Sequence, residues 1–207
     1  MFQTLKPLIL ASGSPRRRDL LTRLSINFDV VVPDVDESQL KEENPEEYVL
    51  RMARSKAADV GTRTGHTWIV AADTIVILED NVLMKPETPG KAVDMLMQLS
   101  GREHQVRTGY CLFCSSEQVC VVDSTVSLVR FQDFDLNWAK AYVDTGEPMD
   151  KAGSYGIQER GGVLVERIEG SYSNVVGLPM AELVRLLVTH GVVAAGLHPG
   201  PVTTSGS

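Results

Sequence analysis

An apolar segment that ends in small residues and runs straight into a helix start constrains this chain more than any other feature. Leu8–Ala11 is apolar throughout, which is typical of a strand buried on both faces. Ser12–Ser14 let backbone N–H groups come close to a ligand, and Pro15 suits the first position of a helix. The positive end of that helix dipole then faces the loop, so the segment predicts a strand–loop–helix unit with an anion site.

Two arginines, Arg16 and Arg17, follow the proline at once. A guanidinium offers fork-shaped donors that suit phosphate oxygens, whereas a lysine acts as a point charge. A plain strand-to-helix turn with solvated arginines explains this segment equally well, so the segment alone leaves both interpretations open.

Length and charge narrow the classes of protein to consider. The chain has 207 residues, 43% of them hydrophobic, which is enough for one well-packed domain. Its net charge of −7 argues against a general nucleic-acid binder, because such proteins gain affinity from excess Lys and Arg. We expect one domain over residues 1–191 and a disordered tail over residues 192–207, where Gly, Ala, Pro, Thr and Ser prevail.

The cysteines and the N-terminal segment bear on the cellular compartment. Cys111, Cys114 and Cys120 lack the second ligand pair that a zinc site needs, so we expect reduced cysteines. Residues 1–7 lack the apolar core of a signal peptide, and no apolar run approaches the length of a membrane span. The expectation is a cytoplasmic protein without a membrane partner.

Hydrophobic periodicity predicts a mixture of helices and strands. The expected strands are residues 8–11, 28–32, 68–78, 82–84, 105–113, 119–130 and 163–168. The expected helices are residues 15–24, 45–60, 89–100, 136–145 and 179–190. The glycine-rich stretch 150–162 predicts an irregular binding loop beside the last strand. Together these elements indicate an α/β sandwich around a mixed sheet.

One carboxylate lies inside an apolar strand. Asp73 belongs to the predicted strand 68–78, where an unpaired charge costs free energy unless it binds a metal, has a partner or opens to a cleft. A strand-end acid that binds backbone groups is the alternative. Asp73 is therefore a candidate for catalysis, where it would activate a water molecule.

Four separated segments occur in a fixed order: Ser12–Arg17, Ala71–Thr74, Lys85–Pro86 and Asp150–Gln158. Together they resemble the Maf family of nucleoside triphosphate pyrophosphatases, over about residues 8–190. The resemblance implies an elongated mixed β-sheet flanked by helices, with two lobes around a central cleft, related to the inosine triphosphate pyrophosphatase fold. Members of this family are commonly homodimers, which is the expectation here.

The resemblance also implies roles for individual residues. Asp73 corresponds to the catalytic proton acceptor, and Glu37 to a second acid, although the segment around Glu37 is also typical of a solvated acidic turn. A nucleoside triphosphate carries about four negative charges, so carboxylates approach it only with a cation between them. Asp73 and Glu37 are thus the expected ligands of Mg²⁺ or Mn²⁺. The matching phosphate donors are Ser12, Arg16, Arg17, Lys56 and Lys85.

Base selectivity is implied by a different subset of residues. The motif Tyr155–Gln158 resembles the branch of the family that acts on dTTP and UTP, and Arg16 and Thr74 match that branch's other discriminating positions. The amide of Gln158 offers both a donor and an acceptor to a uracil edge. Alternatively, Gln158 only ties down its own glycine-rich loop.

The expected activity is hydrolysis of dTTP, UTP and modified pyrimidine triphosphates between the α and β phosphates. The products would be a nucleoside monophosphate and pyrophosphate, and the role would be cleansing of the nucleotide pool. The alternatives are a 7-methyl-GTP pyrophosphatase and a non-catalytic nucleotide sensor that regulates cell division. Asp73 and Glu37 favour an enzyme, because a pure binder has little use for acids beside a polyanion.

Overall fold

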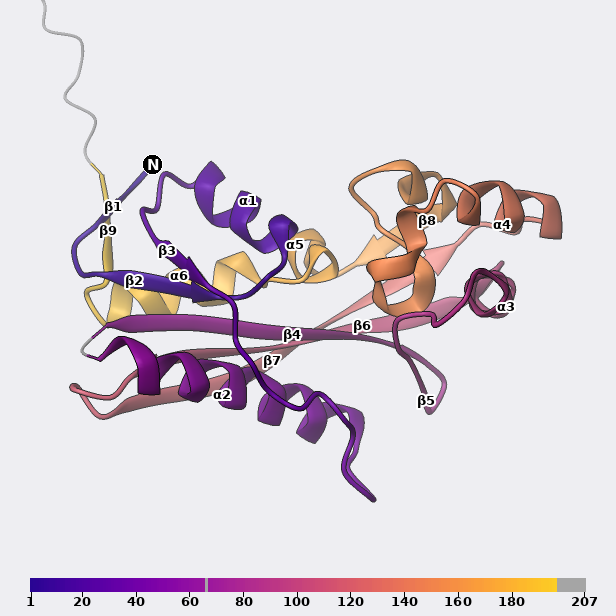
Figure 1. The fold of residues 1–207 in the computed structure, drawn as a ribbon. Helices are drawn as coiled ribbons and strands as arrows, with labels where there is room; N and C mark the ends of the chain where they lie inside the picture. Colours follow the sequence, from indigo (N-terminus) through magenta and orange to yellow (C-terminus); the bar gives the residue numbers. More distant parts are fainter. Residues whose placement is uncertain (66, 197–207) are drawn as a thin grey trace, which may run out of the picture.

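The computed structural model describes residues 1–65 and 67–196, which form an elongated mixed α/β fold (Figure 1). The strands are β1 Phe2–Thr4, β2 Leu8–Ala11, β3 Asp29–Val31, β4 Trp68–Leu78, β5 Asn81–Leu83, β6 Glu103–Cys114, β7 Val119–Phe131, β8 Val165–Glu169 and β9 Val193–Ala195. The α-helices are α1 Pro15–Arg23, α2 Pro45–Thr64, α3 Pro89–Leu99, α4 Leu136–Val143, α5 Tyr172–Val176 and α6 Met180–Thr189. Three 3₁₀ helices are η1 Glu147–Asp150, η2 Ala152–Ser154 and η3 Arg160–Leu164.

The main sheet has seven strands in the order β3-β2-β4-β6-β7-β8, with β5 pairing to β4. β2 runs parallel to β3 and β4, whereas β4, β6, β7 and β8 pair antiparallel in turn. The long strands β4, β6 and β7 run through the molecule from one end to the other (Figure 1). The prediction of a mixed sheet flanked by helices is therefore confirmed.

One edge of β4 is interrupted in the middle. β6 pairs with β4 continuously over Ile69–Ile77. On the other side β2 pairs only with Trp68–Ala71, and β5 only with Val76–Leu78. Within the described residues, Ala72–Ile75 thus have no partner strand on that side. Because successive side chains of a strand point to opposite faces, Asp73 and Thr74 beside this gap reach opposite faces of the sheet.

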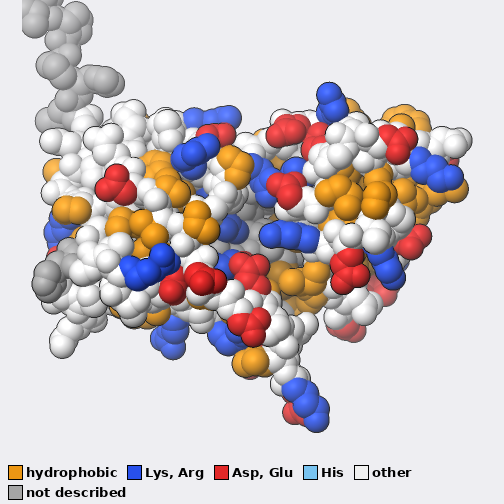
Figure 2. All heavy atoms as spheres, viewed as in Figure 1, with side chains coloured by type: hydrophobic (Ala, Val, Ile, Leu, Met, Phe, Trp, Pro, Cys, Tyr) orange, Lys and Arg blue, Asp and Glu red, His pale blue; other side chains and the backbone are white. Residues whose placement is uncertain are grey.

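Helices cover the two faces differently (Figure 1). α2 packs along one face, where Met52 and Ala57 belong to the buried clusters beneath it. On the other face α1, α5 and α6 cover one end, where Leu21, Leu183 and Trp68 belong to one buried cluster. α3 and α4 contribute to a separate cluster at the opposite end. These two covered ends are the two lobes, and Figure 2 shows a hollow between them.

Local sequence explains why α2 forms and why it lies so close to the sheet. Asn44 caps the helix in a capping box with Glu47, and Pro45 occupies its first turn. Gly109 of β6 lies directly beneath it, and a Cβ there would collide with the carbonyl of Val49. The glycine therefore allows the close approach that carries α2 toward the gap in β4.

The predicted disorder of residues 192–207 is wrong for its first part. Val192 and Val193 are fully buried, and β9 pairs antiparallel with β1 at the other end of the chain. Local composition could not reveal this order, because its source is a partner strand almost the whole chain away. Residues 197–207 lie outside the described residues.

Three further differences concern local elements. The stretch 150–162, which the sequence predicts to be irregular, overlaps three 3₁₀ helices. Such short helices of a single turn tolerate glycines that would weaken a longer helix. α5 is absent from the predicted elements, because five residues are too few for a periodic signal. α2 continues to Thr64, beyond the predicted end at residue 60. Within the described residues, no helix is both long and apolar enough to cross a membrane.

Candidate active site

A cleft of about 620 Å³ opens between the lobes at the interrupted edge of β4 (Figure 2). All nine residues that the sequence singles out line it: Ser12, Arg16, Arg17, Glu37, Lys56, Asp73, Thr74, Lys85 and Gln158. The topology explains the convergence, because the loop after β2 emerges beside the gap in β4, at the carboxyl ends of two parallel strands.

Lys56 joins the two candidate acids. Asp73 points from β4 toward α2, and Lys56 on the buried face of α2 reaches Oδ1 of Asp73 over 2.6 Å. The same ammonium lies 2.6 Å from Oε1 of Glu37, which belongs to the segment between β3 and α2. The side chain of Asp73 is only 11% exposed, and that of Glu37 is 49% exposed. One buried cation thus holds two carboxylates together at the cleft.

The surroundings keep Glu37 ionised. Partial burial raises the pKa of the Glu37 carboxyl, but the hydrogen bond from Lys56 and the charges of Lys56, Lys85 and Arg17 outweigh it and lower that pKa overall. The hydroxyl of Tyr48 donates to the backbone carbonyl of Glu37 over 2.8 Å and so ties its segment to α2. Sequence reasoning gave Tyr48 no site role, because this bond joins a helix face to a segment without regular structure.

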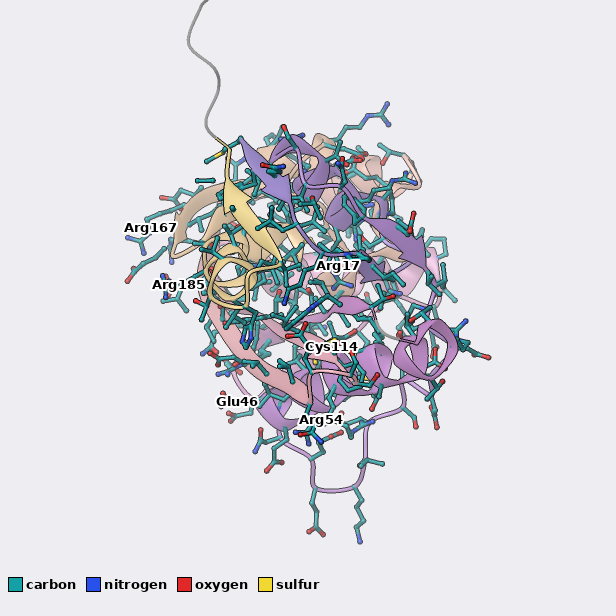
Figure 3. All side chains as sticks on the ribbon, turned by 90° about the vertical axis from the view of Figure 1, so that its left-hand side faces the viewer. Arg17, Glu46, Arg54, Cys114, Arg167 and Arg185 are labelled. Atoms are coloured by element: carbon teal, nitrogen blue, oxygen red, sulfur yellow. The ribbon has the colours of Figure 1, made fainter. Side chains whose placement is uncertain are left out.

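Arg17 reaches the site from the opposite face of the sheet. Its Nε donates to the Gly177 carbonyl over 2.7 Å, Nη1 to Ser12 Oγ over 3.3 Å and Nη2 to Thr74 Oγ1 over 3.0 Å. The end-on view of Figure 3 shows Arg17 inside the molecule. A guanidinium has five N–H donors, so two remain for an anion in the cleft. Burial lowers the pKa of Arg17, and the charge of Asp73 opposes that shift.

A buried polar network supports this geometry. Thr74 Oγ1 lies 2.9 Å from Thr108 Oγ1, and Thr108 donates to the Asn174 carbonyl. The amide of Asn174 donates in turn to Ser127 Oγ over 2.9 Å. Thr74, a predicted specificity position, accepts a hydrogen bond from Arg17. A chain of hydrogen bonds across β4, β6 and β7 holds Thr74 in place and so orients Arg17.

The loop after β2 leaves backbone N–H groups available at the start of α1. Ser12 Oγ accepts the backbone N–H of Ser14 over 3.2 Å, which folds the loop back on itself. Ser14 is the N-cap residue of α1, yet its side chain caps no backbone N–H. The first N–H groups of this helix therefore remain available at its positive end.

The second lobe contributes Lys85 and Gln158 to the cleft. It also contributes Asp150 and Lys151, which begin the Asp150–Gln158 motif and to which the sequence alone assigns no role. Within the described residues, the side chains of Lys85 and Gln158 have no protein hydrogen-bond partner, although both line the cleft. Asp150 lies 3.6 Å from Arg16 across the cleft and 2.7 Å from Lys151. The position of Asp150 and Lys151 at the start of the Asp150–Gln158 motif was the one sequence signal that could have pointed to them.

The two carboxylates suit a cation that is shared with the substrate. Lys56 holds Asp73 and Glu37 together at the cleft, and no cluster of three metal-ligating side chains exists among residues 1–65 and 67–196. Mg²⁺ is commonly bound by one or two carboxylates together with substrate phosphates and water. The residues present therefore fit a divalent cation that arrives with a polyphosphate.

Comparison with known proteins identifies the family of this chain. The sequence model of the family described as Maf-like protein matches residues 7–190. The chain belongs to the Maf family. Its relatives include a dTTP/UTP pyrophosphatase of Desulfotalea psychrophila, 47% identical over 94% of this chain and 100% of that protein. Those of Myxococcus xanthus (47% identical; 89% and 93% covered) and Vibrio cholerae (46%; 89% and 98%) carry the same name.

A solved structure places this Maf protein in a wider fold group. The Ham1 protein of Staphylococcus aureus superposes with a TM-score of 0.51, covering 89% of this chain and 100% of that one. The two sequences are only 13% identical, so the likeness concerns the fold alone. It agrees with the mixed α/β fold that the sequence predicts.

Proposed function

We propose that this Maf protein is a dTTP/UTP pyrophosphatase, which hydrolyses the bond between the α and β phosphates. The products are a nucleoside monophosphate and pyrophosphate. The observation that carries the proposal is the convergence on one cleft of an acid pair, a loop with available N–H groups and a set of cationic side chains. Relatives 43–47% identical over nearly their full length bear this name.

The phosphates bind along the Ser12 loop in this proposal. The N–H groups at the start of α1 and the remaining donors of Arg17 take phosphate oxygens, and Lys85 approaches from the opposite lobe. Arg16 adds a charge close to Asp150 at the mouth of the cleft. The loop N–H groups, Arg17 and Lys85 act on any triphosphate, whatever its base, whereas Arg16 is also one of the predicted discriminating positions.

Asp73 accepts a proton from the attacking water. Lys56 occupies Oδ1 of Asp73, so we assign the proton to Oδ2. Lys56 also keeps Glu37 close to Asp73, because the same ammonium binds both carboxylates. Asp73 and Glu37 would hold Mg²⁺ or Mn²⁺, which would supply neutralisation of phosphate charge and activation of the attacking water.

Gln158 recognises the pyrimidine. Within the described residues its amide has no protein partner, which argues against the alternative that Gln158 only ties down its own loop. An amide that meets no protein group can offer a donor and an acceptor to a uracil edge. The proposal extends to modified pyrimidine triphosphates that keep this edge.

A panel of triphosphates tests the function. Purified protein is incubated with dTTP, UTP, dATP and 7-methyl-GTP in Mg²⁺, in Mn²⁺ and in a chelator, and the products are separated. We expect dTMP and pyrophosphate from dTTP in either metal and no turnover with chelator. Preferred cleavage of 7-methyl-GTP would overturn the substrate assignment. Tight dTTP binding without turnover in either metal would favour the nucleotide sensor instead.

Two further proposals concern the setting of the enzyme. We propose a cytoplasmic location, which is consistent with the free thiols of Cys111, Cys114 and Cys120 in the structure. We also propose a homodimer, as is common in this family, which analytical ultracentrifugation would test directly.

A further inference from the structure

The loop that carries Gln158, residues 156–161, is held at one end by Tyr142. Tyr142 lies near the end of α4, and its hydroxyl accepts the backbone N–H of Gly156 over 3.0 Å. The same hydroxyl donates to Oε1 of Glu147, in η1, over 2.8 Å. Burial raises the pKa of Tyr142, and the hydrogen bond to Glu147 adds to this rise while the bond from Gly156 opposes it, so the hydroxyl stays protonated and keeps donating.

Glu147 holds the other end of the loop. Its Oε1 accepts the backbone N–H of Gly161 over 3.1 Å, and its Oε2 accepts that of Arg160 over 3.1 Å. The carboxylate therefore receives three hydrogen bonds, one of them from Tyr142. The pair Tyr142 and Glu147 thus bridges the loop on both sides of Gln158.

The backbone of the loop packs tightly against Tyr142 and Glu147, so a side chain at its glycines would clash. A Cβ at Gly161 would collide with the hydroxyl of Tyr142. A Cβ at Gly156 would lie 2.6 Å from Cε of Lys151, whose ammonium donates to the Glu147 carbonyl over 2.6 Å. Glycine at both positions lets the loop seat directly on Tyr142 and Glu147.

Neither anchor belongs to the cleft wall, whereas Gln158 does. Because the amide of Gln158 has no protein partner among the described residues, its position depends on the loop backbone that the pair holds. We propose that Tyr142 and Glu147 are positioning residues that set pyrimidine selectivity by fixing the Gln158 loop. This inference rests on the proposed function, in which Gln158 meets the base.

The test is a double-mutant cycle read as substrate selectivity. Tyr142→Phe keeps the ring but removes both hydrogen bonds, and it is measured alone and combined with Gln158→Ala. The readout is kcat and KM for dTTP and for dATP, and selectivity is the ratio of the two kcat/KM values. We expect Tyr142→Phe to lower selectivity about 5- to 10-fold through dTTP, because losing hydrogen bonds of ordinary strength has about this effect.

Coupling separates positioning from a general structural role. If Tyr142 acts through Gln158, the double variant has the selectivity of Gln158→Ala alone. The matched control is Tyr110→Phe, which removes a hydroxyl bonded to Asp123 away from the cleft and leaves selectivity unchanged. Glu147→Gln is the second variant, and it decides the question if thermal unfolding shows that Tyr142→Phe does not fold.

Each alternative outcome overturns the inference. The pair does not act through Gln158 if Tyr142→Phe lowers kcat/KM equally for dTTP and dATP or leaves both unchanged, because selectivity then stays the same. The same conclusion follows if the double variant loses more selectivity than Gln158→Ala alone. If Gln158→Ala leaves selectivity unchanged, Gln158 does not recognise the base. The inference about Tyr142 and Glu147 then fails as well, because it depends on that recognition. If Gln158→Ala lowers selectivity as expected but Tyr142→Phe leaves it unchanged, the positioning role of Tyr142 and Glu147 is rejected, while base recognition by Gln158 stands.

Discussion

Lys56 sets the charge balance at the centre of the site. One ammonium lies 2.6 Å from each of two carboxylates, so Lys56, Asp73 and Glu37 together carry a net charge of −1. A divalent cation would bring this group to +1, which favours the approach of a triphosphate. The cluster thus becomes attractive to substrate only together with the cation.

The first prediction concerns Asp73. Asp73→Asn keeps the shape of the side chain but removes the proton acceptor, so kcat for dTTP should fall by about 10²- to 10⁴-fold. The fold should survive, as circular dichroism would check. Asp123→Asn, an exposed acid away from the cleft, is the matched control. Turnover within about threefold of the wild type would exclude Asp73 as the base and move that role to Glu37.

The second prediction concerns the phosphate donors. Arg17→Ala or Lys85→Ala removes a charge-assisted contact, so kcat/KM should fall about 10- to 150-fold for every triphosphate tested. Arg18→Ala changes the exposed neighbour on the same helix and should have little effect. A loss confined to one base type would instead assign these residues to base recognition.

At the scale of elements, the predicted site residues meet at the part of the β4 edge that, in the described part of the chain, has no partner strand between β2 and β5. The sequence was sufficient to place Asp73 in a strand and Lys56 on a helix, because hydrophobic periodicity reports local structure. It could not show that Lys56 bridges Asp73 and Glu37, since that contact depends on how α2 seats on the sheet. Polar contacts between distant segments leave no periodic pattern.

The third prediction tests that seating. Gly109→Ala would place a Cβ against the Val49 carbonyl of α2, so the helix must shift or the protein loses stability, by about 1–3 kcal/mol. Because α2 carries Lys56, dTTP turnover should fall as well. Urea unfolding and dTTP hydrolysis measure the two effects. Gly90→Ala, in the open first turn of α3, should be neutral or slightly stabilising. Unchanged stability in Gly109→Ala would contradict the close approach.

At the scale of the whole molecule, the lobe of α3 and α4 has a buried histidine at its centre. His104 packs edge-on against Phe131, and its Nε2 lies 2.8 Å from the hydroxyl of Tyr155, which lines the cleft. Burial lowers the pKa of His104 to about 4. This lobe therefore holds a neutral imidazole at physiological pH.

The fourth prediction follows from that pKa. The folded protein binds fewer protons at His104 than the unfolded chain, so this contribution to stability is present above about pH 6.5 and is lost as the pH falls toward 4. From pH 7 to pH 5 the loss should be about 2 kcal/mol. Urea unfolding of the wild type and of His104→Gln measures it. The same pH dependence in both proteins would assign the loss to other groups.

The pairing of β1 with β9 has a consequence for chain connectivity. Phe2–Thr4 lies beside Val193–Ala195, and the N–H of Gly196 donates to the Met1 carbonyl over 3.0 Å. A short linker could therefore join residues 196 and 1, with new ends opened in the exposed turn 115–118 between β6 and β7. We expect this circular permutant to fold and to hydrolyse dTTP like the parent, because the cut lies far from the cleft residues along both strands.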